Sequence, residues 1–163
     1  MSTAKDRVLE REFNAARAIA APMGKADAEA LQLSAPSMSG TELNAEAQRI
    51  PLFYEAVKVK NMKDREAGFV CLSSARRVVK LIQPYDSTIY QQEPEMLPAQ
   101  WAFVWSNNPA HARPWISLST SPYMIGNVCS WGLSIYRSLI DNNVWSPEGY
   151  PQGWEWVQDV ELA

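Results

Sequence analysis

Aromatic residues and prolines are concentrated in one short stretch near the end of the chain. The segment WSPEGYPQGW, residues 145–154, contains Trp145, Tyr150 and Trp154 together with two prolines. Proline fixes the backbone φ angle and cannot donate a hydrogen bond to a neighbouring strand, so we expect a rigid, irregular loop. Flat rings held on such a loop can bind by packing against the apolar face of a ligand or of another protein.

A related segment lies upstream of this one. PEMLPAQWAFV, residues 94–104, and PEGYPQGWEWV, residues 147–157, both read PExxPxxWxxV. Before them, residues 68–82 and 126–140 align without a gap and share a glycine, a valine, a cysteine, a leucine and an isoleucine. Because Cys, Trp and Pro are uncommon residue types and recur in one order, the sequence indicates a tandem duplication.

Each copy predicts the same small antiparallel sheet of three strands. The first strand is expected around FVCL or NVCS, the second at VVKLI or IYRSLI, and the third at WAFVW or WEWVQDV. A sheet of this size buries very little core, so one or two large aromatic side chains must supply most of it. We expect Trp101 and Trp154, which share the PxxW position, to be these core anchors.

The N-terminal third of the chain has the pattern of helices. Apolar residues recur with a period close to 3.6 over residues 6–21, and alanine-rich helices are expected at residues 25–33 and 41–49. Helices this short need a partner, either the rest of the chain or another subunit. From Pro51 onward, β-branched and aromatic residues predict strands. The expected fold class is α+β, with a helical segment (1–50), a first β module (51–105) and a second β module (106–163).

Composition and charge argue against several classes of protein. The 163-residue chain has a net charge of −3 and no run of Lys or Arg, so we do not expect it to bind nucleic acid. No stretch approaches ~20 consecutive apolar residues, and the first residues lack the pattern of a secretion signal. We therefore expect neither membrane insertion nor export.

Catalysis has little support in the residue types present. With Cys71, Cys129 and His111 as the only cysteines and histidine, a four-ligand zinc site cannot form within one chain, and we expect no cofactor. The cysteines lie in apolar contexts, where a thiol usually behaves as a small buried hydrophobe. A glycosidase would need two carboxylates across a sugar bond, and no spacing brings two together among Glu93, Glu95, Asp141, Glu148 and Glu155. We expect a protein that is not an enzyme.

The second copy resembles a known family of small binding modules. Gly126, Val128, Tyr136 and Arg137, followed by the whole WSPEGYPQGW stretch, are similar to the chitin-binding-type carbohydrate-binding modules of families 5 and 12. The variant of the motif that reads W-[ST]-P resembles modules of bacteriophage tail and other virion proteins as well as modules appended to chitinases. The first copy departs from the pattern, with a longer loop and with Tyr90 nearest to the position of Trp145.

This resemblance implies a binding site for carbohydrate. In the family, one or two exposed aromatic rings stack on N-acetylglucosamine-type rings, and the final Trp belongs to the core; Trp145 matches the stacking position. Tyr150 and Trp131 are additional candidates from our own interpretation of the residues, because a loop and a turn should leave them partly exposed. The same three rings could instead pack the small module or contact a neighbouring subunit, since Trp and Tyr are enriched at interfaces.

The resemblance also suggests where such a protein works. A virion protein is made and assembled in the host cytoplasm and released by lysis, which explains a surface-binding module without a secretion signal. We therefore expect a bacteriophage structural protein of the tail, a fibre or the capsid, which contacts other virion proteins and binds cell-surface polysaccharide. The amphipathic segment 6–21 predicts a homo-oligomer, or equally packing against the chain's own modules. A purely architectural role, or a glycan-active enzyme, is the alternative.

Overall fold

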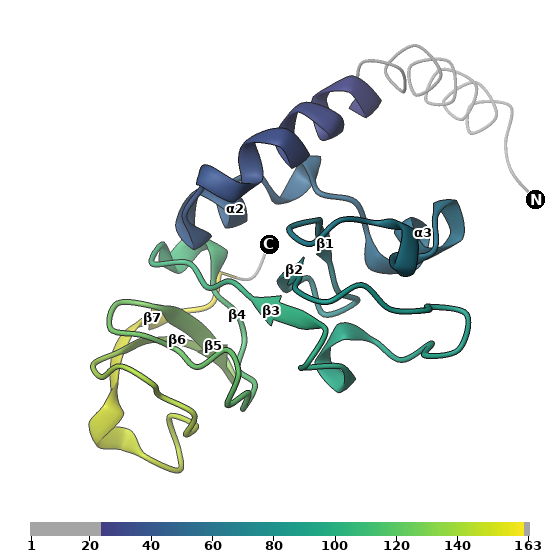
Figure 1. The fold of residues 1–163 in the computed structure, drawn as a ribbon. Helices are drawn as coiled ribbons and strands as arrows, with labels where there is room; N and C mark the ends of the chain where they lie inside the picture. Colours follow the sequence, from purple (N-terminus) through teal and green to yellow (C-terminus); the bar gives the residue numbers. More distant parts are fainter. Residues whose placement is uncertain (1–23, 162–163) are drawn as a thin grey trace, which may run out of the picture.

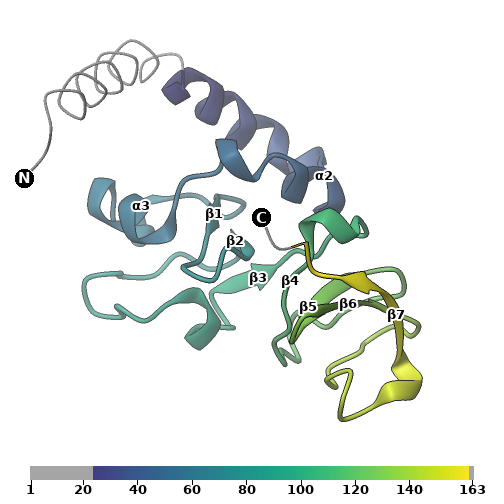
Figure 2. The ribbon, with the colours of Figure 1, turned by 180° about the vertical axis from the view of Figure 1, so that it is seen from behind.

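Two small β-sheets lie side by side, and the N-terminal helices run along one side of them (Figures 1 and 2). The computed structural model describes residues 24–161, so the predicted helix at residues 6–21 lies outside the described part of the chain. Helices combined with largely antiparallel sheets confirm the α+β class.

The two predicted alanine-rich helices are present and pack on the first sheet. The first spans residues 24–34 and continues into the 3-10 turn η1 (Ala35–Ser37); α2 (Gly40–Ala45) and the 3-10 turn η2 (Ala47–Arg49) form the second. A capping box, in which Ser39 and Glu42 each bind the other's backbone, starts α2. The apolar faces of these helices form a core with the first sheet that includes Leu31, Ala35, Leu43, Ile50, Val70, Leu72 and Val78. The partner that these short helices need is therefore the chain itself.

A further helix, α3 (Phe53–Val59), lies where the sequence predicted strand character. Phe53 and Ala56 lie one helical turn apart and are both buried in the core, so tertiary packing overrides the β-branched residues around them. The 3-10 turn η3 (Met62–Asp64) follows α3 and leads to the first strand.

The first sheet has the predicted form. It consists of β1 (Val70–Leu72), β2 (Val78–Leu81) and β3 (Trp101–Phe103), all antiparallel and in sequence order. The 3-10 turn η4 (Pro94–Met96) lies in the proline-rich loop that leads from β2 to β3.

The second sheet has one strand more than predicted. It contains β4 (Arg113–Pro114), β5 (Val128–Trp131), β6 (Ser134–Ser138) and β7 (Trp154–Asp159), and β4 pairs parallel to β5. The prediction of three antiparallel strands was therefore wrong for this module. A two-residue strand that ends in proline carries almost no sequence signal, and proline is tolerated there because β4 lies at the edge of the sheet. The 3-10 turns η5 (Pro109–His111) and η6 (Pro151–Gly153) precede β4 and β7.

The two sheets are built on the same hydrogen-bond pattern. Gly68 donates to the carbonyl oxygen of Leu81 over 2.7 Å, and Gly126 donates to that of Ser138 over 2.9 Å. Both glycines have a positive φ, 103° and 93°, which favours glycine. The gapless alignment placed Leu81 opposite Leu139, whereas the hydrogen bonds place it opposite Ser138, because the second hairpin is one residue shorter.

One apolar core extends through both sheets. Trp101 is fully buried and Trp154 is 6% exposed, which confirms both as core anchors. Cys71 and Cys129 are buried in the same core as free thiols. The rings of Trp105 and Tyr123 stack at 4.3 Å between the two anchors and connect the modules.

Candidate functional site

Trp145 and Tyr150 form a pair of exposed rings on the loop that connects β6 and β7. The side chain of Trp145 is 50% exposed and that of Tyr150 is 39% exposed. Their ring centroids lie 5.4 Å apart, with the planes tilted by 47°. This loop is the yellow-green segment at the lower end of the second module in Figure 1. The structure thus brings together two of the three aromatic residues that the sequence singled out.

Hydrogen bonds from the core fix the backbone at Trp145. Its carbonyl oxygen accepts the indole N–H of Trp154 over 2.9 Å and that of Trp115 over 3.1 Å. The side-chain oxygen of Asn143 accepts the backbone N–H of Trp145 over 3.3 Å. Asn143 is itself fully buried, and its amide donates to Ser138 and to the carbonyl oxygen of Gly153. The exposed ring is therefore attached to a backbone that cannot rearrange without breaking its hydrogen bonds to the buried side chains of Trp154 and Asn143.

Tyr150 is positioned by the turn that follows Trp145. The hydroxyl of Ser146 accepts the N–H of Gly149 over 2.8 Å, and its carbonyl accepts the N–H of Tyr150 over 2.9 Å. The Tyr150 ring lies directly over Gly153, where a Cβ atom would come within 2.8 Å of the ring. Gly153, in the sequence P-Q-G-W, therefore leaves space for the Tyr150 ring because it has no side chain.

Trp131 lies outside this pair. It is half-buried at the end of β5, and its ring meets Trp115 edge to face at 5.5 Å and 83°. Trp115 links Trp131 to the ring pair, because its indole N–H donates a hydrogen bond to the backbone carbonyl of Trp145. Trp115 was not among the predicted site residues, although a tryptophan at the end of the polar connector SNNPAHARPW was the available signal.

A second overlooked residue is Trp156 on β7. Its side chain is 56% exposed, whereas Phe103, the residue aligned with it in the first copy, is 5% exposed. In the first module, Tyr90 is 53% exposed, but no aromatic ring within residues 24–161 pairs with it. The two-ring arrangement of Trp145 and Tyr150 therefore has no counterpart in the first copy.

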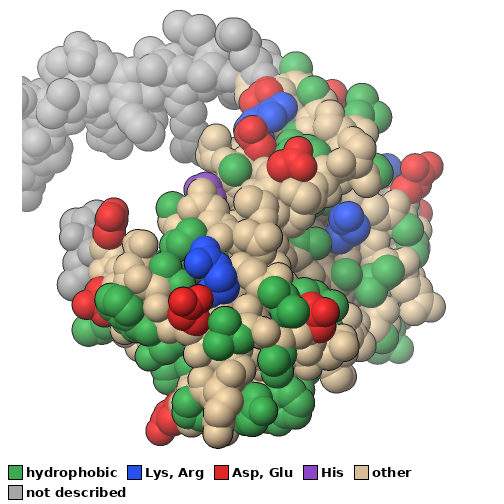
Figure 3. Space-filling model, turned by 90° about the vertical axis from the view of Figure 1, so that its left-hand side faces the viewer, with side chains coloured by type: hydrophobic (Ala, Val, Ile, Leu, Met, Phe, Trp, Pro, Cys, Tyr) green, Lys and Arg blue, Asp and Glu red, His purple; other side chains and the backbone are tan. Residues whose placement is uncertain are grey.

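Further large apolar side chains are exposed on the second module. Figure 3 shows hydrophobic side chains gathered over the lower part of this face of the molecule. The large apolar residues that are exposed on the second module are Met124, Ile125, Leu133, Leu139, Trp145, Tyr150 and Trp156.

Several polar and ionisable side chains within residues 24–161 are buried in the fold. Glu95 is ion-paired with Arg77 at 3.1 Å, and both side chains are largely buried. Burial raises the pKa of the Cys71 thiol, and it raises the pKa of Cys129 to about 12, so both thiols are protonated at neutral pH. In the part of the chain that the structure describes, no three His, Cys, Asp or Glu side chains are close enough to hold a metal ion.

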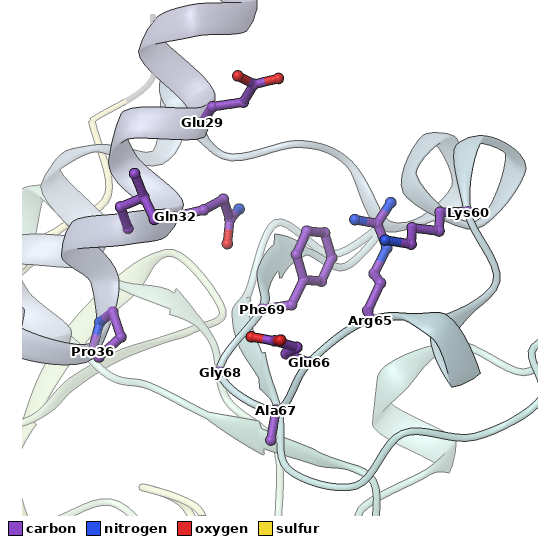
Figure 4. Close-up of a pocket in the computed structure, with 10 residues that line it drawn as sticks. Glu29, Gln32, Pro36, Lys60, Arg65, Glu66, Ala67, Gly68 and Phe69 are labelled. Atoms are coloured by element: carbon purple, nitrogen blue, oxygen red, sulfur yellow. The ribbon is translucent and has the colours of Figure 1, made fainter.

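A hollow also lies on the first module, and none of the three aromatic site candidates lines it. It has a volume of about 580 Å³ and lies between the helix at residues 24–34 and the segment at residues 60–69 (Figure 4). Arg65 and Lys60 line it together with Glu29 and Glu66, and the Arg65 guanidinium lies 4.0 Å from the centroid of the Phe69 ring. Charges of both signs line this hollow, so they single out no class of ligand.

The comparisons with known proteins returned nothing. Neither the family models nor the curated proteins nor the solved structures include a match to this chain. Over residues 24–161, no helix is long and apolar enough to cross a membrane.

Proposed function

We propose that this chain is a non-enzymatic structural protein of a bacteriophage virion, and that its second module binds surface glycans through Trp145 and Tyr150. The observation that carries the proposal is the exposed ring pair on a loop whose backbone is fixed by buried tryptophan and asparagine side chains. A stacking platform of this kind loses little conformational freedom when a sugar binds, which favours affinity.

Ring geometry is compatible with sugar stacking. The apolar C–H face of a pyranose packs on an aromatic ring much as an aliphatic side chain does. The same loop carries two polar side chains that could orient the sugar, those of Ser146 and the exposed Glu148. The affinity of one such site is low, and many copies on a particle would raise it through multivalency.

The proposal includes a tandem duplication of one ancestral module. Matched positions support it: Trp101 and Trp154 are both buried in the core, and Gly68 and Gly126 make equivalent hydrogen bonds. The first copy lacks the ring pair, so we assign glycan binding to the second copy and a structural role to the first. Placement in a virion depends on the resemblance of the W-S-P motif to modules of phage tail proteins.

Binding of the purified protein to chitin and to host cell-surface polysaccharide tests the proposal. We expect Trp145→Ala to weaken binding about tenfold, or ~1.4 kcal/mol, and Tyr150→Ala to weaken it less. Leu133→Ala is the matched control, because it removes another exposed apolar side chain of the same module. Near-ultraviolet circular dichroism must show that each variant keeps its tertiary packing. A folded wild-type protein that binds neither polysaccharide would overturn the proposal.

An architectural role is the second candidate function. It is favoured by the apolar side chains of Met124, Ile125 and Leu139, which are exposed on the same module as the ring pair. Such a surface fits another virion protein better than a sugar, because apolar contacts dominate the centre of protein interfaces. Under this alternative, Trp145→Ala would impair particle assembly and leave the particle's binding to polysaccharide unchanged.

A further inference from the structure

The outer edge of the first sheet is covered by the second module. The backbone N–H of Phe103 on β3 donates to the hydroxyl of Ser121 over 2.9 Å, and the indole N–H of Trp105 donates to the carbonyl oxygen of Ser121 over 2.9 Å. The ring of Phe103 stacks on Trp105 at 5.9 Å, and Trp105 stacks on Tyr123 at 4.3 Å. A turn of the following module thus accepts a hydrogen bond from the edge strand β3 and helps to bury Phe103.

Within residues 24–161, no strand pairs with the corresponding edge of the second sheet, β7. Trp156 pairs with Tyr136 as Phe103 pairs with Val79, so the two aromatic residues hold equivalent positions. Trp156 is 56% exposed, and none of the ring pairs within residues 24–161 includes it. Gln158 stands two residues further on, where the first module has Trp105. An exposed edge strand with a bare tryptophan at its centre is a template for pairing with another chain.

The negative charge of residues 154–161 indicates which kind of chain could cover this edge. Residues 154–161 contain Glu155, Asp159 and Glu161 and no basic residue. Pairing β7 with the β7 of another copy would place these carboxylates near one another, which is unfavourable. A basic segment fits instead, because its cations can pair with the carboxylates and can also lie over the face of Trp156.

The chain offers one such segment in the equivalent place of the first module. Residues 58–65 carry Lys58, Lys60, Lys63 and Arg65 against the single acid Asp64. They form a turn like the one that covers β3: Asp64 donates to the carbonyl oxygen of Asn61 over 3.0 Å, as Ser121 donates to that of Leu118 over 3.1 Å. All three lysines are exposed.

From these observations we propose that β7 of one copy binds residues 58–65 of a second copy. The contact joins two different surfaces, so a bound pair of copies still presents one free β7 and one free basic segment, on different copies. Such head-to-tail association builds a ring or a growing filament and does not stop at a closed dimer. The kind of contact that covers β3 within one chain would thus recur between two chains.

Sedimentation velocity of the full-length protein over a range of concentrations tests this contact. We expect the mass to rise with concentration beyond that of a dimer, and to fall when salt is raised, because salt screens exposed charges. Glu155→Lys and the double variant Lys60→Glu/Lys63→Glu should each weaken association about tenfold, and mixing the two variants should restore it. Glu148→Lys, an exposed acid outside β7, should associate like the wild type.

Three outcomes would overturn the inference. One is a wild-type protein that remains a monomer at every concentration. Another is a closed dimer that Glu155→Lys affects but Lys60→Glu/Lys63→Glu does not, because that result would indicate pairing of β7 with itself. The last is an oligomer that neither charge reversal changes, which would place the contact elsewhere in the chain. The substituted side chains are exposed, so all the variants should fold.

Discussion

Trp154 donates its indole N–H to the carbonyl oxygen of Trp145 over 2.9 Å, so the core anchor of the second module also holds the loop that carries its most exposed aromatic pair. Stability of the core and the shape of the candidate site are therefore coupled. Several substitutions can separate the two effects.

Trp154→Phe tests this coupling directly. Phenylalanine fills much of the core space but leaves the carbonyl oxygen of Trp145 with one donor fewer, so we expect a loss of unfolding free energy of about 1–3 kcal/mol together with weaker binding to chitin. Trp115→Phe is the matched control, because it removes the other indole N–H, which bonds at a more exposed place. Urea denaturation measures both variants. Equal losses of unfolding free energy for Trp154→Phe and Trp115→Phe would show that the hydrogen bond from Trp154 contributes no more than the one from Trp115.

Gly153→Ala should disturb the site although it replaces neither of the two exposed aromatic residues. The added Cβ would come within 2.8 Å of the Tyr150 ring, so the ring must move away from its present position beside Trp145. We expect a loss of chitin binding close to that of Tyr150→Ala, with the circular dichroism of the core retained. Gly24→Ala serves as a control, since open space surrounds that glycine. Unchanged binding by Gly153→Ala would show that the position of Tyr150 does not matter.

Arg77 connects the first sheet to the connector of the second module. It forms an ion pair with Glu95 at 3.1 Å and donates to the carbonyl oxygen of Pro114 over 2.8 Å. Arg77→Met leaves Glu95 largely buried without its partner, so we expect a loss of about 3–5 kcal/mol in thermal or urea unfolding. Arg77→Met/Glu95→Leu should recover part of this loss. A double variant as unstable as Arg77→Met would mean that the carbonyl contact dominates.

Asp86 predicts a loss of stability in acid. Hydrogen bonds from the Thr88 and Asn61 side chains and from the Thr88 backbone lower the pKa of Asp86 to about 2. Because the pKa in the folded state lies below the value of ~3.9 in the unfolded chain, ionised Asp86 stabilises the fold above that value. The contribution is lost as the pH falls from about 4 to about 2. Melting temperatures of wild type and Asp86→Asn should converge over this interval; parallel curves would contradict the assignment.

The thiols should be inert in the folded protein. Cys71 and Cys129 are fully buried, and burial raises the pKa of both, to about 12 for Cys129, so hardly any thiolate exists at pH 8. We expect a thiol reagent such as 5,5′-dithiobis(2-nitrobenzoate) to label neither cysteine until denaturant is added, and then to label both. Ser74→Cys, at an exposed position, provides the positive control. Rapid labelling of the native protein would show that the core opens locally.

Much of the fold could be predicted from the local sequence. Short β-branched and aromatic runs marked six of the seven strands within residues 24–161, and the recurring PxxW identified both core anchors. The parts that were missed depend on contacts between distant segments. β4 exists because Arg113 and Pro114 lie beside β5, and α3 exists because Phe53 and Ala56 pack into the core. A one-residue difference between hairpins is likewise invisible when both copies share the same flanking residues.

The candidate site was predictable only where it is local in sequence. Trp145 and Tyr150 stand five residues apart in a proline-rich loop, so their proximity follows from the sequence. Trp115 reaches the site across 30 residues of chain, and no spacing indicates that contact. The exposure of Trp156 was also hidden, because its counterpart Phe103 is buried by a module that follows the first sheet.

The core that extends through both sheets has a consequence for how the molecule melts. Trp101, Tyr123 and Trp154 belong to one apolar cluster, so neither sheet can lose its packing while the other keeps its own. Calorimetry should record a single cooperative transition for the described part of the chain, in spite of its two separate sheets. Neither sheet, with the segments around it, would then fold when moved alone into another protein. A substitution in one sheet would be under selection for its effect on the packing of both.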